Sequence, residues 1–362
     1  LVGSEMCIRD RTFTMEGDPA IPVIVDTWMK GLRDFDVATA YEAFRKSATT
    51  PGAQNRLRPD IDPYVERGYI PLGFYAKDLA GDTSVSHALE YYVADHALSL
   101  LADSLGHGDD ARLFRDRSLG YRHYYDREFG TLRPINDDGT FLEPFDPKAG
   151  ENFTAAPGFH EGSAWNYTFF VPHDVNGLAG LFGSREAFVR ELDRLFTLES
   201  DEMQLDVSDV TGLMGQYAHG NEPSHHVVYL YTMIGQPAKT ADKVREILTT
   251  LYHDQPDGLS GNEDVGQMSA WYVLSSLGFY QVEPAGGRYF FGSPLFDRAE
   301  VRVRDGVLTV TAHNNSAANK YIQAVKLNGK PYTKPYIAFD DIAAGGRLEF
   351  EMGAQPAVWY EL

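Results

Sequence analysis

Residues 84–106 read SVSHALEYYVADHALSLLADSLG, a segment with the repeat of a long helix. Apolar residues recur every three or four positions from Val85 to Leu100, Ser84 can cap the start, and Gly106 can end the helix. Similar patterns predict further helices over residues 36–46, 111–129, 184–196, 225–234, 240–252 and 267–277. The larger part of the chain is therefore predicted to be mainly α.

These helices follow one another in pairs, and long loops rich in glycine and proline connect them over 48–83, 130–160 and 200–223. No repeat of fixed length is present, which disfavours a solenoid. Paired helices with long loops favour an α/α toroid, here a partial six-hairpin barrel that is incomplete at its N-terminal end. The inner helices and loops of a toroid enclose a concave centre, where a ligand is expected.

The pattern changes after Phe291. Residues 301–304 and 307–312 alternate between apolar and polar residues on either side of the turn Asp305-Gly306. Further short strands are predicted over residues 322–327, 336–339, 348–352 and 358–360. We therefore predict an α/α domain over residues 12–290 and a small antiparallel β-domain over 291–362, which supports the helices and carries no chemistry.

The first eleven residues do not fit this organisation. Residues 6–11 read MCIRDR, which is what the end of a common sequencing-library transposon encodes. We interpret residues 1–11 as a non-native segment and exclude them from the fold. The natural N-terminus and its signal are then expected to lie upstream, with the full-length protein secreted or periplasmic.

Composition limits the partners of the chain. Its 362 residues hold 52 acidic and 32 basic side chains, a net charge of −20, which disfavours nucleic acids and membrane surfaces as partners. No apolar run is long enough to span a membrane. Cys7 is the only cysteine, so an intrachain disulfide or a cysteine-ligated metal is excluded. Neutral sugars and divalent cations remain compatible with this composition.

Three loop segments concentrate the chemistry. They are FHEGSAWNYTFFVPHD at 159–174, GQYAHGNEPSHH at 215–226 and DGLSGNEDVGQMSAWY at 257–272. In each, glycine lets the backbone approach a ligand, a carboxylate lies near a helix start, and an aromatic residue can wall a pocket. A carboxylate at one such place is more often a helix cap. Because three segments share this mixture of glycine, carboxylate and aromatic residues, we favour a functional site over helix capping.

The polar residues of these segments suit a particular ion. Amide and carboxylate oxygens are the ligands of a hard cation such as calcium. His225 and His226 are adjacent, and neighbouring residues on a helix diverge by about 100°, so we favour sugar binding or core hydrogen bonds over zinc. No phosphate loop, dinucleotide fingerprint or serine nucleophile elbow is present in the sequence.

The second and third segments carry a family resemblance. GNEPSHH at 220–226 and GNEDVGQMSAWY at 261–272, with Glu222 and Asp264 placed 42 residues apart, closely resemble the family 92 glycoside hydrolases, which are exo-acting α-mannosidases. Pro294 and the sequence Leu327-Asn328-Gly329 match as well. The resemblance covers residues 12–362. It implies an N-terminal β-sandwich joined to an α/α toroid, of which this chain lacks the sandwich and the first helices.

The resemblance also implies the catalytic roles. Glu161 matches the general acid and Asp264 the general base of an inverting hydrolysis. Asn262 stands where some members carry a second carboxylate, which leaves Asp264 as the sole candidate. Ser163 and Asn166 stand where asparagine and glutamine are expected, so the local contacts of the acid differ. If the two carboxylates lay apart, His160 and Asp174 would be the next pair to consider.

The remaining site residues are expected from the same resemblance. The calcium is placed near Gln216, Asn221, Glu222 and Gln267. The residues expected to bind the substrate are Trp165, His219, Gly220, Asn221, His225, His226, Asn262 and Trp271. The missing N-terminal β-sandwich is expected to complete the site.

The implied activity is removal of terminal α-linked mannose from glycans of the N-glycan type, with the α-1,2 linkage as first candidate. Another α/α-toroid glycosidase remains an alternative. A polysaccharide lyase is disfavoured, because these three loops lack the arginine or lysine that would bind a uronate. The alternative outside enzymes is a truncated, inactive or sugar-binding protein.

Overall fold

The computed structural model describes residues 16–74, 82–150, 156–200 and 210–361, so the prediction for residues 1–11 lies outside it. The chain forms two compact units. The first unit is Leu1–Pro223 with Pro284–Gly286, and the second is Ser224–Glu283 with Gly287–Leu362. This division groups the last helices with the β-strands, whereas the sequence analysis placed a boundary between residues 290 and 291.

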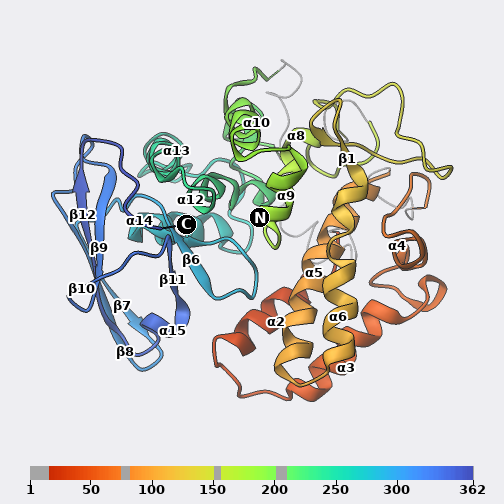
Figure 1. Cartoon of the computed structure of the whole chain (residues 1–362), viewed down its shortest axis with the longest axis horizontal. Helices are drawn as coiled ribbons and strands as arrows, with labels where there is room; N and C mark the ends of the chain where they lie inside the picture. The colour runs from red at the N-terminus through yellow and green to blue at the C-terminus, as the bar shows by residue number, and fades with distance from the viewer. Residues whose placement is uncertain (1–15, 75–81, 151–155, 201–209, 362) are drawn as a thin grey trace. The chain divides into compact units, whose positions relative to one another are not determined.

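The first unit is helical around α5 (Ser84–Ser104), which packs beside α6 (Gly108–Arg117) and against α2 and α3 (Figure 1). Its other helices are α2 (Ala20–Met29), α3 (Val37–Thr49), α4 (Ile61–Arg67), α8 (Ala164–Thr168), α9 (Val175–Leu181) and α10 (Arg185–Thr197). Two short hairpins pair β1 (Tyr125–Asp126) with β2 (Thr131–Leu132), and β3 (Leu213–Met214) with β4 (Tyr217–Ala218).

The structure confirms two of the three predicted helix caps. The Asp36 carboxylate accepts from the Thr39 N–H at 3.1 Å, and the Ser184 hydroxyl accepts from the Ala187 N–H at 3.1 Å, so both predicted caps are confirmed. The predicted cap at Ser84 is wrong, because Ser84 is the first residue of α5 and its N–H donates to Asp82.

Two predicted helices are shorter than expected. The helix predicted over 111–129 ends at Arg117, followed by a 3₁₀ turn over Gly120–Tyr124. A Cβ at Gly120 would lie 2.3 Å from the Gly68 carbonyl oxygen, so the chain turns here to pack closely against another segment. The helix predicted over 225–234 is instead a 3₁₀ turn, Val227–Tyr229, followed by α12 (Leu230–Met233).

A buried ionic network lies in the core of the first unit. The Asp95 carboxylate on α5 is fully buried and accepts from the Arg58 guanidinium at 2.7 Å and the Tyr64 hydroxyl at 2.9 Å. The Arg117 guanidinium at the end of α6 lies 2.8 Å from the same carboxylate. Arg58 also contacts Asp18 at 3.3 Å. These ion pairs join four separate segments of the unit.

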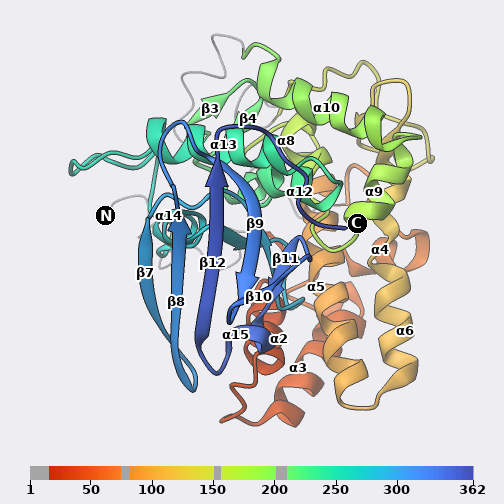
Figure 2. The same cartoon turned by 60° about the vertical axis from the view of Figure 1, so that its left-hand side comes forward.

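The second unit combines helices with two sheets. Its helices are α12, α13 (Pro237–Thr250), α14 (Gln267–Leu277) and α15 (Phe339–Ile342). The larger sheet has the order β10-β9-β12-β8-β7, from Lys330–Pro331, Tyr321–Leu327, Gly346–Gly353, Gly306–His313 and Arg298–Val303 (Figure 2). The smaller sheet has the order β11-β6-β5, from Tyr336–Ala338, Arg288–Phe291 and Phe279–Gln281.

The larger sheet is not purely antiparallel as predicted. Strand β12 lies between β8 and β9, antiparallel to β9 but parallel to β8. A parallel neighbour requires a crossover, and the chain between β8 and β12 supplies it through β9, β10, β11 and α15. The strand predicted over 358–360 is also wrong: this segment is irregular, and the Tyr360 hydroxyl donates to the Thr232 carbonyl at 2.5 Å.

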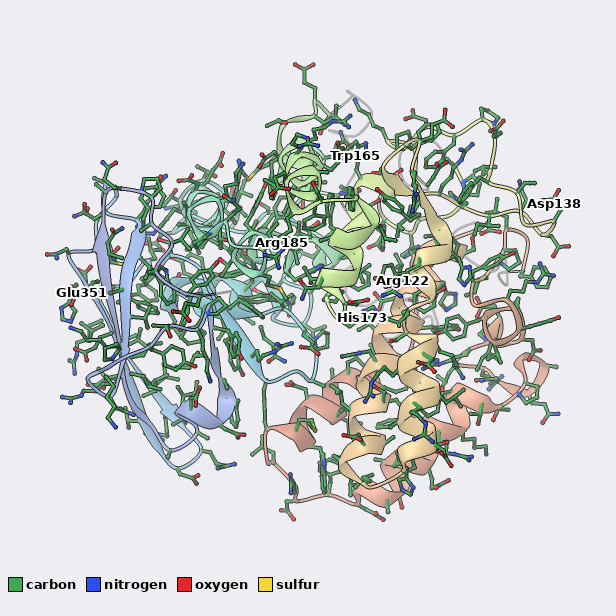
Figure 3. The ribbon with its side chains drawn as sticks, viewed as in Figure 1. Arg122, Asp138, Trp165, His173, Arg185 and Glu351 are labelled. Carbon is green, nitrogen blue, oxygen red and sulfur yellow. The ribbon has the colours of Figure 1, made fainter. Side chains whose placement is uncertain are left out.

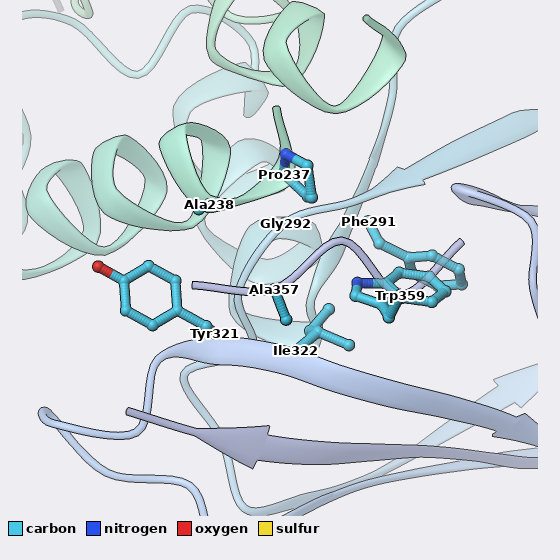
Figure 4. A pocket seen from close by; sticks show the side chains of 8 residues that line it. All are labelled: Pro237, Ala238, Phe291, Gly292, Tyr321, Ile322, Ala357 and Trp359. Carbon is cyan, nitrogen blue, oxygen red and sulfur yellow. The ribbon is translucent and has the colours of Figure 1, made fainter. Parts of the chain in front are cut away.

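The core of the second unit is apolar. Phe350 on β12 is fully buried, and its ring meets that of Phe291 edge to face at 5.4 Å. Leu277, Leu308, Val310, Val325 and Leu348 belong to the same cluster. A pocket beside this core, lined by Phe291, Tyr321, Trp359 and their neighbours, has a volume of about 10 Å³ (Figure 4). That volume fits one water molecule and excludes a sugar.

Candidate active site

Glu161 lies in the loop that precedes α8 in the first unit. Its backbone has φ +48°, a left-handed conformation that is uncommon outside glycine and is often found at functional sites. Its side chain is 25% exposed, and its Oε1 lies 3.5 Å from Nε2 of His160. Asn221 donates from Nδ2 to the Glu161 carbonyl oxygen at 2.9 Å, so the first and second predicted segments meet at this residue.

The second segment is built on the β3–β4 hairpin. Gln216, in the turn, is buried and donates from Nε2 to the Glu199 carbonyl at 3.1 Å. His219 follows the hairpin and is buried, with its Nδ1 2.8 Å from the Tyr217 hydroxyl. Gly220 donates its N–H to the Thr211 carbonyl at 2.9 Å. The structure therefore holds this segment rigidly beside the Glu161 loop.

Trp165 (labelled in Figure 3) is buried on α8. Its ring lies 5.0 Å from the Arg194 guanidinium carbon. Its indole N–H has no hydrogen-bond partner in the described part of the chain. The cation–π contact joins α8 to α10. Its predicted contact with a sugar stays a prediction.

Asp174, the second member of the alternative pair with His160, has a structural role. Its Oδ1 accepts from the Gly177 N–H at 3.0 Å and caps α9. Its Oδ2 accepts from the Tyr121 hydroxyl at 2.9 Å and from the guanidinium of Arg122 (labelled in Figure 3) at 2.8 Å. For this carboxylate, helix capping and ion pairing explain the position without any catalytic role.

Asp264 lies in an exposed turn before α14 in the second unit. Asp264 has φ +48°, Val265 +58° and Gly266 +91°, three left-handed residues in succession. Val265 is 90% exposed although it is apolar. The neighbouring Glu263 explains how the turn is held, because its carboxylate accepts from the N–H and hydroxyl of Ser269 at 2.9 and 2.7 Å. Glu263 thus caps α14, and Asp264 and the exposed Asn262 project from a strained turn.

His225 is fixed by the third segment. Gln267 Nε2 lies 3.0 Å from His225 Nδ1 and 2.9 Å from the Tyr280 hydroxyl. Because the Gln267 amide nitrogen donates, Nδ1 of His225 accepts in this contact. Trp271 is fully buried and donates from its indole N–H to the His225 carbonyl at 2.9 Å. Its observed contacts support His225, while its predicted sugar contact stays a prediction.

The expected calcium ligands divide between the units: Gln216, Asn221 and Glu222 belong to the first, and Gln267 to the second. Glu222 is exposed, and Asn221 uses its nitrogen for Glu161, which leaves its side-chain oxygen available. Within the described ranges, no group of three His, Cys, Asp or Glu side chains is arranged to hold a metal. These four residues fit calcium only if it is bound by amide and carbonyl oxygens together with one carboxylate, that of Glu222.

The sequence analysis missed two glutamates, Glu16 and Glu90, which lie near the Glu161 loop. Burial, together with the nearby charges of Glu16 and Glu222, raises the pKa of Glu90 on α5 to about 8. Burial also raises the pKa of Glu16. His87, one turn before Glu90, lies 3.1 Å from Asp60, which raises its pKa despite burial. The only sequence signal was that Glu90 lies in a helix whose other residues are largely apolar.

Comparisons with known proteins identify the family of this chain. Residues 5–354 match the sequence model of the glycosyl hydrolase family 92 catalytic domain. An uncharacterized secreted glycosidase from Arthroderma benhamiae is 29% identical over 373 residues, which is 96% of this chain and 46% of that protein. No helix of the described part of the chain combines the length and apolarity needed to cross a membrane.

Two solved structures from Bacteroides thetaiotaomicron are similar. A family GH92 α-mannosidase, in complex with mannoimidazole, is 36% identical with a TM-score of 0.87, over 96% of this chain and 44% of that one. An inverting mannosidase of the same family is 32% identical with a TM-score of 0.84, over 96% of this chain and 47% of that one. The chain spans about half the length of these relatives. The long family match and the shared fold confirm the predicted resemblance: the chain belongs to glycosyl hydrolase family 92.

Proposed function

We propose that this chain is the catalytic part of a secreted or periplasmic exo-α-mannosidase, which removes terminal α-linked mannose from glycans with inversion at the anomeric carbon. Its helices would form part of an α/α toroid, and a further N-terminal portion, a β-sandwich, would complete the site. The lengths of the relatives support this, since the chain spans only 46% of the curated one. The α-1,2 linkage is the first candidate substrate.

The observation that carries the proposal is the contrast between two carboxylates within a family 92 match over residues 5–354. Glu161 and Asp264 each have a left-handed backbone at the end of a loop that precedes a helix. Glu161 is enclosed by neighbouring loops, whereas Asp264 is exposed. An inverting glycosidase needs two carboxyl groups with such different tasks.

In the proposed reaction, the protonated Glu161 carboxyl donates its proton to the glycosidic oxygen as that oxygen leaves C1. The Asp264 carboxylate removes a proton from a water molecule, which attacks C1 from the opposite face. The leaving alcohol and β-mannose are the products, and Glu161 and Asp264 then exchange protons with solvent. This geometry requires about 6.5–9.5 Å between the two carboxyl groups. His225 is proposed to bind a sugar hydroxyl.

A bound calcium would polarise sugar hydroxyls and favour a flattened ring. Gln216, Asn221, Glu222 and Gln267 are proposed to hold it through their oxygens. In the full-length protein, exhaustive chelation should abolish hydrolysis, and calcium rather than zinc should restore it. Activity that persists after chelation would contradict the metal requirement.

The test of the acid and base uses two families of substrates. Glu161→Gln should slow hydrolysis of mannosides with poor leaving groups by about 100-fold or more, and that of activated aryl mannosides far less, because good leaving groups need little protonation. Asp264→Asn should slow both alike, since every substrate needs an activated water. NMR should detect β-mannose first. Initial α-mannose would show retention and overturn the proposal.

Linkage preference is tested with α-1,2, α-1,3, α-1,4 and α-1,6 mannobioses on the full-length protein. The α-1,2 disaccharide is expected to be hydrolysed fastest, and a faster reaction with another linkage would redirect the assignment.

The second candidate is a sugar-binding or inactive part of such an enzyme, because the chain spans less than half of each solved relative. Comparing this chain with the full-length protein on one aryl mannoside decides between them. Turnover by the full-length protein alone would favour the second candidate for the isolated chain.

A further inference from the structure

The backbone around Glu161 is hydrogen-bonded at successive positions. The His160 N–H donates to the Ser86 hydroxyl at 3.0 Å, and the His160 carbonyl accepts from the Tyr167 hydroxyl at 2.6 Å. The Glu161 carbonyl accepts from Asn221 at 2.9 Å. All these residues belong to the first unit. Because side chains of other segments bind these backbone groups, the direction in which the Glu161 side chain leaves the loop is determined by its surroundings.

Close packing restricts the same loop. A Cβ at Gly150 would lie 1.6 Å from the Gly162 carbonyl oxygen, so backbone touches backbone there. On its other side, a Cβ at Gly162 would meet Asn166 Oδ1 at 3.1 Å and the Tyr167 ring at 3.2 Å. The loop therefore has little room to shift as long as Asn166 keeps its place.

Asn166 joins this loop to the second segment. It is 8% exposed, and its Oδ1 accepts from the Ser163 N–H at 2.8 Å and the Ser163 hydroxyl at 3.0 Å. Its Nδ2 donates to the Gln216 carbonyl at 2.6 Å. One amide thus satisfies a backbone donor two residues after Glu161 and a backbone acceptor on the neighbouring hairpin. A carboxylate of the same shape could keep the first contact but would repel the Gln216 carbonyl.

We propose that Asn166 is a positioning residue for Glu161: by fixing Ser163 and Gln216 to each other, it sets where the Glu161 carboxyl delivers its proton. This inference rests on the proposed function of Glu161. Asn166 touches no reacting atom in this account and acts through the loop. A displacement of the acid by about 1 Å is enough to lower a rate by about 100-fold.

The decisive variant is Asn166→Asp, measured in the full-length protein. The kcat/KM for mannosides with poor leaving groups should fall by about 100-fold, and that for activated aryl mannosides by less than about 10-fold. A general loss of structure would lower both values equally. Asn136→Asp is the matched control, because within the described residues the Asn136 side chain bonds only inside its own turn, to Thr140 and Phe141, and the change should leave both values unchanged.

Asn166→Ser provides a second, neutral variant that cannot reach Gln216, in case the aspartate prevents folding. It should show the same dependence on the leaving group. Equal losses for both substrate types, or no loss, in a folded variant would overturn the inference. Glu161→Gln is measured beside them: if that variant shows no dependence on the leaving group, the proposed function has failed instead.

Discussion

Both units contain an apolar cluster, but the first unit also buries an ionic network. In the first unit, α5 carries a fully buried aspartate, Asp95, within reach of two guanidinium groups and a tyrosine hydroxyl. In the second, the larger sheet encloses an apolar cluster around Phe350. Removing one partner of a buried ion pair leaves a charge without compensation, whereas removing an apolar side chain leaves a cavity. The first unit should therefore respond to the loss of a buried charge as well as to changes of volume, and the second chiefly to changes of volume.

The largest effect is expected at the ionic network. Asp95→Ala should lower the free energy of unfolding of the first unit by about 3–5 kcal/mol, because the buried Arg58 and the largely buried Arg117 both lose this carboxylate, although Arg58 still contacts Asp18. Hydrogen exchange read by mass spectrometry should show faster exchange in α5 and α6 than in β8 and β12. Asp103→Ala, at the exposed end of α5, is the control and should change little. Equal loss of protection in both units would contradict the comparison.

A smaller effect is expected from the apolar core. Phe350→Ala should cost about 3 kcal/mol, from lost burial and a cavity between the two sheets. Here protection should be lost in β8, β9 and β12 first. Phe296→Ala, whose ring is 40% exposed, should be nearly neutral by the same measurement. If α5 instead lost its protection from hydrogen exchange first, the two units would not respond independently to changes in their interiors.

The third prediction concerns pH in the first unit. The folded protein holds the Glu90 proton up to a pH near 8, whereas an unfolded glutamate loses it near 4.5. Between those values the folded state binds more protons, so the free energy of unfolding falls as pH rises. Glu90→Gln should remove this loss, making the variant more stable than the parent by roughly 1–3 kcal/mol at pH 8 but not at pH 4. Thermal unfolding across pH 4–8 measures it, and a pH-independent difference would refute it.

The smallest effect is expected at the turn that holds Asp264. Glu263→Ala removes the carboxylate that caps α14 and should cost about 1 kcal/mol, seen as faster hydrogen exchange at the start of that helix. Asp257→Ala, an exposed carboxylate of the same loop, is the control. An unchanged exchange rate in the Glu263 variant would mean that the three left-handed residues hold the turn without this cap.

Local patterns in the sequence predicted those features, such as helix caps and spans, that depend on residues close together along the chain. The caps at Asp36 and Ser184 and the full span of α14 from 267 to 277 were recognised because short-range spacing sets them. The end of α6 at Arg117 was not, because it depends on the Gly68 carbonyl meeting Gly120. No periodicity carries information about such a tertiary contact.

The same distinction applies to the site. Glu161 and Asp264 were predicted from motifs, but the link from Asn221 to the Glu161 carbonyl needed the structure. Glu90 was missed because its high pKa comes first from burial in the folded chain and then from the charge of Glu16, far away in sequence. The parallel pairing of β12 was missed as well, because alternating residues predict a strand without predicting its neighbours.

The position of β12 bears on how the second unit is made. The strand formed last along the chain, Gly346–Gly353, lies in the middle of the sheet, between β8 and β9. While the ribosome still holds these residues, β8 and β9 have no partner between them and each exposes unpaired backbone. The sheet can therefore close only after synthesis of this strand. A premature stop before Gly346 would release a chain in which β8 and β9 each have an unpaired edge that can pair with other chains, rather than a slightly shortened domain.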